Sequence, residues 1–112
     1  MEIGTTPTHT FNIPKDIYDK IAEVKITYTQ SGKAEPILEK YLSKGECELK
    51  DGKIVTRLSQ DDTFSFDPNK SFVNIQIRVL TAGNDCFKSK VMTETIGRCL
   101  DNEVLEANEY VE

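Results

Sequence analysis

His9 is the only histidine in this sequence and therefore the only imidazole available for acid–base chemistry. A catalytic imidazole activates a Ser or Cys nucleophile and is itself oriented by a third group. No local signature of such a triad surrounds His9, which lies in an alternating stretch that ends at Pro14, as an edge strand would. We interpret His9 as a surface histidine and predict no catalytic residue.

Four side chains with oxygen atoms are clustered between positions 61 and 69, where a cation could bind. Asp61, Asp62, Asp67 and Asn69 stand within nine residues, and Ca²⁺ takes its oxygen ligands from loops. Their spacing does not follow the EF-hand pattern, and Asp and Asn are also common turn formers. We interpret the cluster as turns, with a calcium site as the minor alternative.

The cysteines and glycines do not form a recognisable site. Cys47, Cys86 and Cys99 are an odd number without a C-x-x-C pair, which fits neither a disulfide framework nor a zinc site. We interpret them as reduced small hydrophobic residues, with a single disulfide as the alternative. The six glycines are scattered and form no phosphate-binding loop. The sequence thus predicts no enzyme, no metal and no cofactor.

The net charge of −5 is concentrated at the C-terminus. Five of the 19 acidic residues lie in the last twelve positions, which contain no Lys or Arg. The remaining body is neutral and lacks the clustered basic residues that nucleic acid requires. Mean hydropathy is −0.45 and no apolar run is long enough to span a bilayer. Because residues 1–10 also lack a signal-peptide pattern, we expect a cytoplasmic protein that binds neither nucleic acid nor membrane.

The stretch Phe72–Leu80 shows the clearest structural pattern of the chain. Val73, Ile75, Ile77 and Val79 alternate with polar or charged residues, which is the period of a half-buried β-strand. β-Branched side chains at all four apolar positions suit a packed sheet surface. A sheet must therefore form around this strand.

Two hairpins are predicted before that strand. Residues 23–30 alternate with Val24, Ile26 and Tyr28 inward, and Ser31-Gly32 then turns the chain toward a return strand at 36–42, which could also be read as a short helix. Asp51-Gly52 between residues 46–50 and 54–58 is the strongest hairpin signal, because both central residues of a type I′ turn need a positive φ.

Shorter elements complete the expected fold. Residues 8–13 form a first strand and residues 15–22 form one helical turn or an irregular crossover. Phe64 and Phe66 lie in a short strand between two turns. Residues 87–96 form the last strand, with either Met92 and Ile96 or Val91 and Thr93 inward. We predict an all-β, immunoglobulin-like sandwich of seven to eight short antiparallel strands over residues 1–100.

The acidic tail, residues 101–112, departs from the strand pattern. Asp101 or Asn102 could cap a helix, and the apolar side chains of Leu100, Val104, Ala107 and Val111 recur at helical spacing. Such a helix is marginal in isolation and needs a partner surface, either this body or a neighbouring chain. An extended tail is the alternative. We predict that partner binding involves Val104, Leu105, Tyr110 and Val111.

Several blocks of the sequence resemble those of a small structural-module protein found in tailed phages and prophages of Gram-positive bacteria. The blocks cover most of the chain and are TFNIP (10–14), VKITYTQSGK (24–33), RLSQDDTFSF (57–66), VNIQIRVLTAGND (73–85) and LDNEVL (100–105). The resemblance implies an immunoglobulin-like or similar β-sandwich in a virion and implies no catalytic residues.

The resemblance leads to an expected function. We expect a non-enzymatic protein that is assembled in the host cytoplasm and binds other virion proteins in several copies, at the neck, tail or baseplate or as capsid decoration. Two alternatives are a carbohydrate- or receptor-binding module at the tail tip and a small intracellular phage inhibitor of a host factor.

Overall fold

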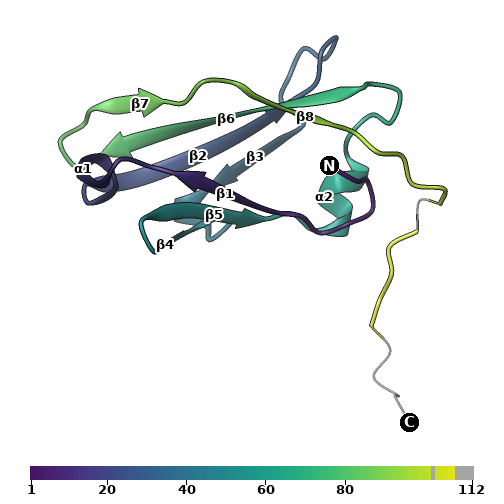
Figure 1. Ribbon diagram of the computed structural model, residues 1–112, viewed down its shortest axis with the longest axis horizontal. Coiled ribbons are helices and arrows are strands. Elements are labelled where there is room, and N and C mark those ends of the chain that lie inside the picture. The colour runs from purple at the N-terminus through teal and green to yellow at the C-terminus, as the bar shows by residue number, and fades with distance from the viewer. Residues whose placement is uncertain (102, 108–112) are drawn as a thin grey trace.

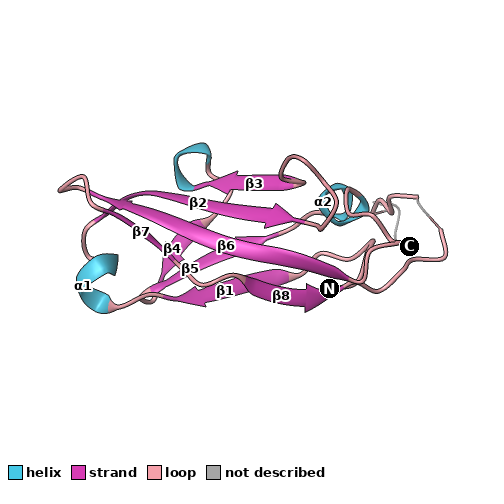
Figure 2. Cartoon of the chain, turned by 90° about the horizontal axis from the view of Figure 1, so that it is seen from above, coloured by secondary structure: helices cyan, strands magenta, loops and turns pink. Residues whose placement is uncertain are grey.

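The computed structural model describes residues 1–101 and 103–107 as two packed β-sheets with two short α-helices. The larger sheet has the order β3 (Leu38–Tyr41), β2 (Ile21–Thr29), β6 (Phe72–Thr81) and β7 (Cys86–Lys88), and β8 (Met92–Thr95) also pairs with β6. The smaller sheet has the order β1 (Thr8–Asn12), β5 (Lys53–Arg57) and β4 (Glu48–Lys50). Every strand pair is antiparallel, and Figure 2 shows the two layers from above. The predicted all-β, two-sheet fold is confirmed.

Strand β6 (Phe72–Thr81) lies at the centre of the larger sheet, as its alternating pattern predicted. Val73, Ile75, Ile77 and Val79 are buried and face the smaller sheet. Strand β2 (Ile21–Thr29) lies beside it and buries Val24, Ile26 and Tyr28. These two strands supply more than half of the core because both alternate strictly along their length.

Both predicted hairpins are present. Strand β3 (Leu38–Tyr41) returns along β2, so the strand interpretation of this segment is confirmed. A 3₁₀ turn at Leu42–Lys44 then leads to β4 (Glu48–Lys50) and β5 (Lys53–Arg57). Asp51 and Gly52 connect these two strands with φ of 52° and 78°, the positive values that a type I′ turn requires.

The outer strands are short. Strand β1 (Thr8–Asn12) pairs only with β5 and is therefore an edge strand, as Pro14 suggested. Of the two alternatives for residues 15–22, the helical turn is present, as helix α1 (Lys15–Tyr18). The predicted last strand is divided into β7 (Cys86–Lys88) and β8 (Met92–Thr95), both paired with β6. Met92 and Ile96 pack against the core, whereas Val91 is exposed.

The predicted strand at Phe64 and Phe66 is wrong. Residues Gln60–Phe64 form helix α2 instead. The Asp62 N–H donates to the Ser59 hydroxyl at 3.0 Å, and the Ser59 N–H donates to the Asp62 carboxylate at 2.9 Å. This reciprocal capping satisfies two N–H groups at the start of the helix, and it outweighs the alternation of the two phenylalanines.

The immunoglobulin-like detail of the predicted fold is not confirmed. In an immunoglobulin sandwich the first two strands share one sheet, whereas β1 and β2 lie in different sheets here. Residues 101 and 103–107 contain no helix and leave the body beside α2, so the extended alternative describes this part of the tail (Figure 1). None of the described helices is long and apolar enough to cross a bilayer.

Candidate functional site

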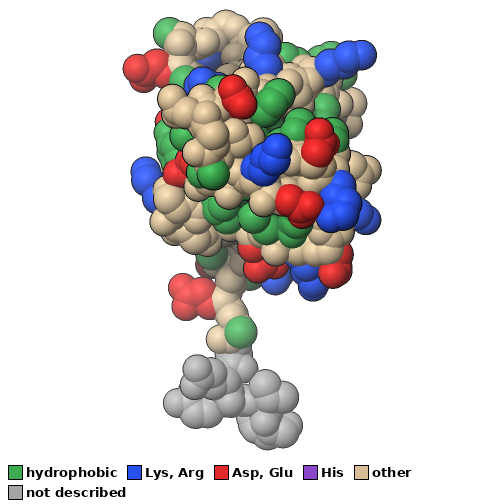
Figure 3. Space-filling view, turned by 90° about the vertical axis from the view of Figure 1, so that its left-hand side faces the viewer, with side chains coloured by type: hydrophobic (Ala, Val, Ile, Leu, Met, Phe, Trp, Pro, Cys, Tyr) green, Lys and Arg blue, Asp and Glu red, His purple; other side chains and the backbone are tan. Residues whose placement is uncertain are grey.

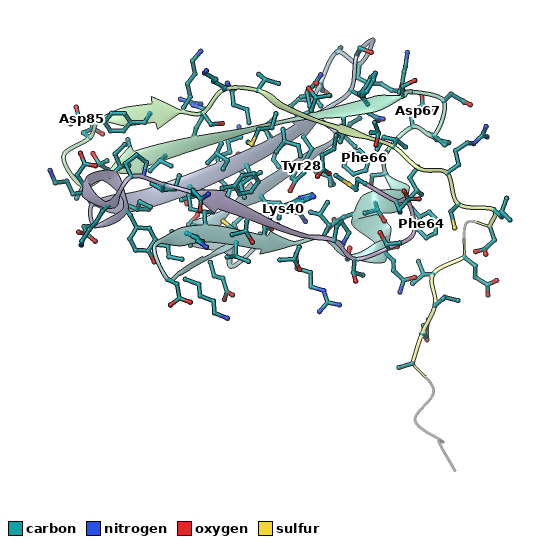
Figure 4. The ribbon with its side chains drawn as sticks, in the orientation of Figure 1. Tyr28, Lys40, Phe64, Phe66, Asp67 and Asp85 are labelled. Carbon is teal, nitrogen blue, oxygen red and sulfur yellow. The ribbon has the colours of Figure 1, made fainter. Side chains whose placement is uncertain are left out.

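His9 lies between the two sheets and not on the surface, so the prediction of a surface histidine is wrong. Its side chain is only 10% exposed, and its Nε2 lies 3.4 Å from the carboxylate of Glu94 in β8. Its Nδ1 shares a 2.8 Å hydrogen bond with the hydroxyl of Tyr28 in β2. Figure 4 shows Tyr28 reaching into the space between the sheets beside Phe66. The three polar side chains thus join β1 to β2 and β8.

Burial decides the protonation of this cluster. It lowers the pKa of His9, and the neighbouring carboxylate of Glu94 opposes that shift without cancelling it. Burial also raises the pKa of Tyr28 well above its usual value, so the phenol keeps its proton. A neutral imidazole with its proton on Nε2 can donate toward Glu94 while Nδ1 accepts from Tyr28. In this arrangement the buried polar atoms satisfy one another across the sheets.

The N-terminal residues extend the same contact. The Met1 ammonium donates to the carbonyl of Thr95 and lies 3.9 Å from Glu94. The Ile3 N–H donates to the carbonyl of Gly97 at 2.9 Å. The N-terminal segment therefore pairs with the chain after β8 before it crosses to the smaller sheet as β1 (Figure 1).

The acidic cluster of residues 61–69 serves the local fold. Burial opposes ionisation of Asp62, but the N–H of Ser59 and the ammonium of Lys40, 3.0 Å away, outweigh it and lower its pKa. Asp67 accepts from the N–H of Asn69, which lowers its pKa, and it pairs with Lys33 at 3.3 Å. Within residues 1–101 and 103–107, no group of three or more His, Cys, Asp or Glu side chains could hold a metal ion.

The three cysteines are unpaired and lie in different environments, which agrees with their interpretation as reduced thiols. Cys47 is part of the core, and burial raises its pKa to about 11. Its thiol therefore stays protonated at neutral pH, which is the inert state of cysteine. Cys86 is exposed on β7, and Cys99 is partly buried.

The C-terminal segment is held by one side chain of α2. The Gln60 side-chain amide donates to the carbonyl of Leu105 at 2.9 Å and accepts from the Leu105 N–H at 2.8 Å. Val104 faces the body and lines a shallow hollow of about 370 Å³ with Thr6, Arg57, Leu58, Ser59, Gln60 and Asp61. The Leu105 side chain is 74% exposed. Tyr110 and Val111, the other predicted partner-binding residues, lie outside the described residues.

A second apolar feature lies at the opposite end of the molecule, between the edge strands β1 and β7. This groove has a volume of about 270 Å³, with Ile77 and Val79 of β6 among its lining residues. Ile13, Pro14 and Ile17 come from the β1 side, and Phe87, Lys88 and Ser89 come from the β7 side. Figure 3 shows this end of the molecule, where hydrophobic side chains lie exposed among charged ones.

No protein-family model and no curated protein matches this chain. The fold defines a class of protein, a two-sheet all-β protein with edge strands that pair on one side only.

Two of the four predicted partner-binding residues can be located. Val104 and Leu105 lie on one segment but face different surroundings, since Val104 lines a hollow of the body and Leu105 is mostly exposed. Sequence reasoning missed Gln60, because a lone glutamine at the start of a helix carries no signal for a contact 45 positions away. It also missed the groove, whose residues come from three separate stretches.

Proposed function

We propose that this chain is a structural protein of a phage-related particle and acts by binding other particle proteins in several copies. The blocks that resemble those of small phage and prophage proteins support the phage context. The main support for a binding role is that the C-terminal segment leaves the sandwich and exposes apolar side chains to solvent. Leu100 and Leu105 are both largely exposed there, whereas soluble monomers usually keep apolar patches small.

The edge strands support the same role. Within the part of the chain that the structure describes, strands β1, β3 and β4 each pair with a single neighbour, and β7 pairs only with β6. An unpaired edge offers N–H and C=O groups to which a strand of another protein can add. Phe87 on β7 is also exposed. A partner that covered this edge would bury its side chain.

Mass spectrometry of purified particles tests the proposal. Particles induced from a host that carries the gene should contain the chain in several copies per particle. A chain present in the lysate but missing from the particles would overturn the proposal and favour an intracellular inhibitor.

A matched pair of variants tests the role of the tail. Deletion of residues 101–112 should lower the copy number in particles, whereas Glu35→Gln in the exposed β2–β3 loop should leave it unchanged. Unchanged incorporation of the truncated chain would remove the tail from the binding mechanism.

A further inference from the structure

The groove between β1 and β7 has the features of a receptor for a single apolar side chain. Its lining includes Ile13, Ile17 and Phe87, with Ile77 and Val79 of the core. Its volume of about 270 Å³ falls below the range of roughly 300–1,000 Å³ usual for small-molecule sites. Phe87 is 44% exposed at its rim. An occupant that covered the groove would remove this apolar surface from water.

Among the described residues, the only charged side chain that lines the groove is the cation Lys88. Lys88 projects from β7, and it forms no ion pair with any of the residues that the structure describes. The nearby cation of α1, Lys15, is already paired with Asp19 at 2.8 Å. A ligand that combines an apolar side chain with a carboxylate would therefore suit the groove.

The C-terminal segment of the same chain has this combination. Leu105 is mostly exposed, and Glu103 and Glu106 lie on either side of it, exposed and without ion pairs among the described residues. Gln60 holds the backbone of Leu105 on both its N–H and its C=O. This anchoring lowers the entropy that the segment would lose on binding.

Leu105 and the groove of the same chain lie too far apart to contact each other. The segment leaves the body beside α2, whereas the groove lies beside α1 at the other end of the long axis (Figure 1). In Figure 4, Phe64 near the segment and Asp85 near β7 mark these two ends. Leu105 can reach such a groove only in a second copy.

We propose that Leu105 of one copy inserts into the groove between β1 and β7 of the next copy, with Glu103 or Glu106 placed against Lys88. The two surfaces differ, so the contact is head-to-tail and generates rings or open filaments. This inference rests on the proposed multi-copy role and names the partner as a second copy of this chain.

Complementation between two full-length variants tests the contact. Phe87→Glu disables the groove and Leu105→Glu disables the segment, and both residues are exposed, so the fold should persist. In sedimentation velocity the native chain should form a concentration-dependent series above the monomer. Each variant alone should associate about tenfold or more weakly, the effect of losing an interface anchor. An equimolar mixture should form heterodimers and nothing larger, because one intact groove meets one intact segment.

Val91→Glu is the matched control, because Val91 is also exposed beyond β7 but does not line the groove. Its association should equal that of the native chain. A native chain that remains monomeric at all concentrations would overturn the contact, as would variants that associate normally or a mixture that stays monomeric.

The failure of this contact can be distinguished from the failure of the proposed function. If Phe87→Glu lowers incorporation into particles while the purified native chain stays monomeric, a different particle protein occupies the groove. That result would overturn self-association and leave the structural role in place.

Discussion

His9 was predicted to lie on the surface, but its side chain is largely buried between the two sheets. Its neighbours come from three strands, since Tyr28 belongs to β2 and Glu94 to β8. Hydrogen bonds make this burial tolerable, because a polar group without partners would cost about 1–3 kcal/mol. The contact therefore serves to hold β1 against the larger sheet.

Removal of the Tyr28 hydroxyl tests this role. Tyr28→Phe keeps the ring but leaves His9 Nδ1 without its 2.8 Å partner. We expect the free energy of unfolding to fall by about 1–2 kcal/mol, measured by urea denaturation. Tyr18→Phe is the control, because its hydroxyl makes no hydrogen bond among the described residues. Equal stability of the two variants would contradict the role of the His9–Tyr28 contact.

The single histidine also makes stability depend on pH. The pKa of His9 is lowered from 6.5 in the folded state, chiefly by burial. Between the folded and unfolded pKa values the unfolded chain binds more protons, so the free energy of unfolding must fall as pH decreases below about 6.5. In Glu94→Gln the carboxylate that raises this pKa is lost, and the His9 pKa should fall further. An NMR titration of the imidazole measures both values, and a pKa at or above 6.5 would contradict the expectation.

At the scale of elements, α2 shows how a cap can override strand alternation. The Ser59–Asp62 capping box starts the helix, and Asp62 also pairs with Lys40 of β3 at 3.0 Å. Thr63 in the same helix is buried, and its hydroxyl donates to the carbonyl of Thr5 at 3.0 Å. The helix therefore contacts both β3 and the segment that precedes β1.

The cap can be tested separately from these tertiary contacts. Ser59→Ala removes the acceptor for the Asp62 N–H, and we expect a loss of about 1 kcal/mol in the free energy of unfolding. Ser31→Ala in the exposed β2–β3 turn should change stability by less than about 0.5 kcal/mol. Chemical denaturation monitored by circular dichroism compares them. An unchanged Ser59→Ala midpoint would show that tertiary contacts alone hold α2.

The β4–β5 turn allows the cost of a positive φ to be measured, because a Cβ added there would cause no steric clash. A Cβ at Gly52 would meet no atom within 4 Å, but φ there is 78°. Gly52→Ala should therefore cost about 1–2 kcal/mol through the left-handed backbone alone. Gly83→Ala is the control, since a Cβ there also meets nothing closer than 3.9 Å and its φ lies outside the left-handed region. Thermal unfolding should separate the two variants, and equal midpoints would contradict the type I′ assignment.

At the scale of the whole molecule, the two candidate binding features lie at opposite ends. The C-terminal segment is fixed by Gln60 at one end, and the groove between β1 and β7 opens at the other. A head-to-tail assembly requires this arrangement, because each copy binds one neighbour through its C-terminal segment and the other neighbour through its groove.

The anchor of the segment can be tested in the isolated protein. Gln60→Ala removes both hydrogen bonds to Leu105, and hydrogen exchange of the Leu105 amide should accelerate by about tenfold. Gln60→Glu retains an acceptor for that amide and should exchange at an intermediate rate. NMR measures both rates, and native-like exchange in Gln60→Ala would show that other contacts fix the segment.

Local patterns in the sequence determined most of the fold. Strict alternation defined β2 and β6 together with their buried faces, and the Asp51-Gly52 pair defined the β4–β5 turn. These features are predictable because each depends on neighbouring residues alone. The missed helix α2 also carried a local signal, the Ser59–Asp62 spacing, but the alternation of Phe64 and Phe66 competed with it.

Only the tertiary structure decided which residues far apart in the sequence contact one another. The sequence by itself determined two-faced strands, a neutral body and an acidic apolar tail. It could not determine that His9 meets Glu94 across 85 positions, that Gln60 holds Leu105, or that β1 and β7 border one groove. Periodicity describes which face of a strand is apolar, whereas the pairing of faces depends on how the sheets pack as a whole.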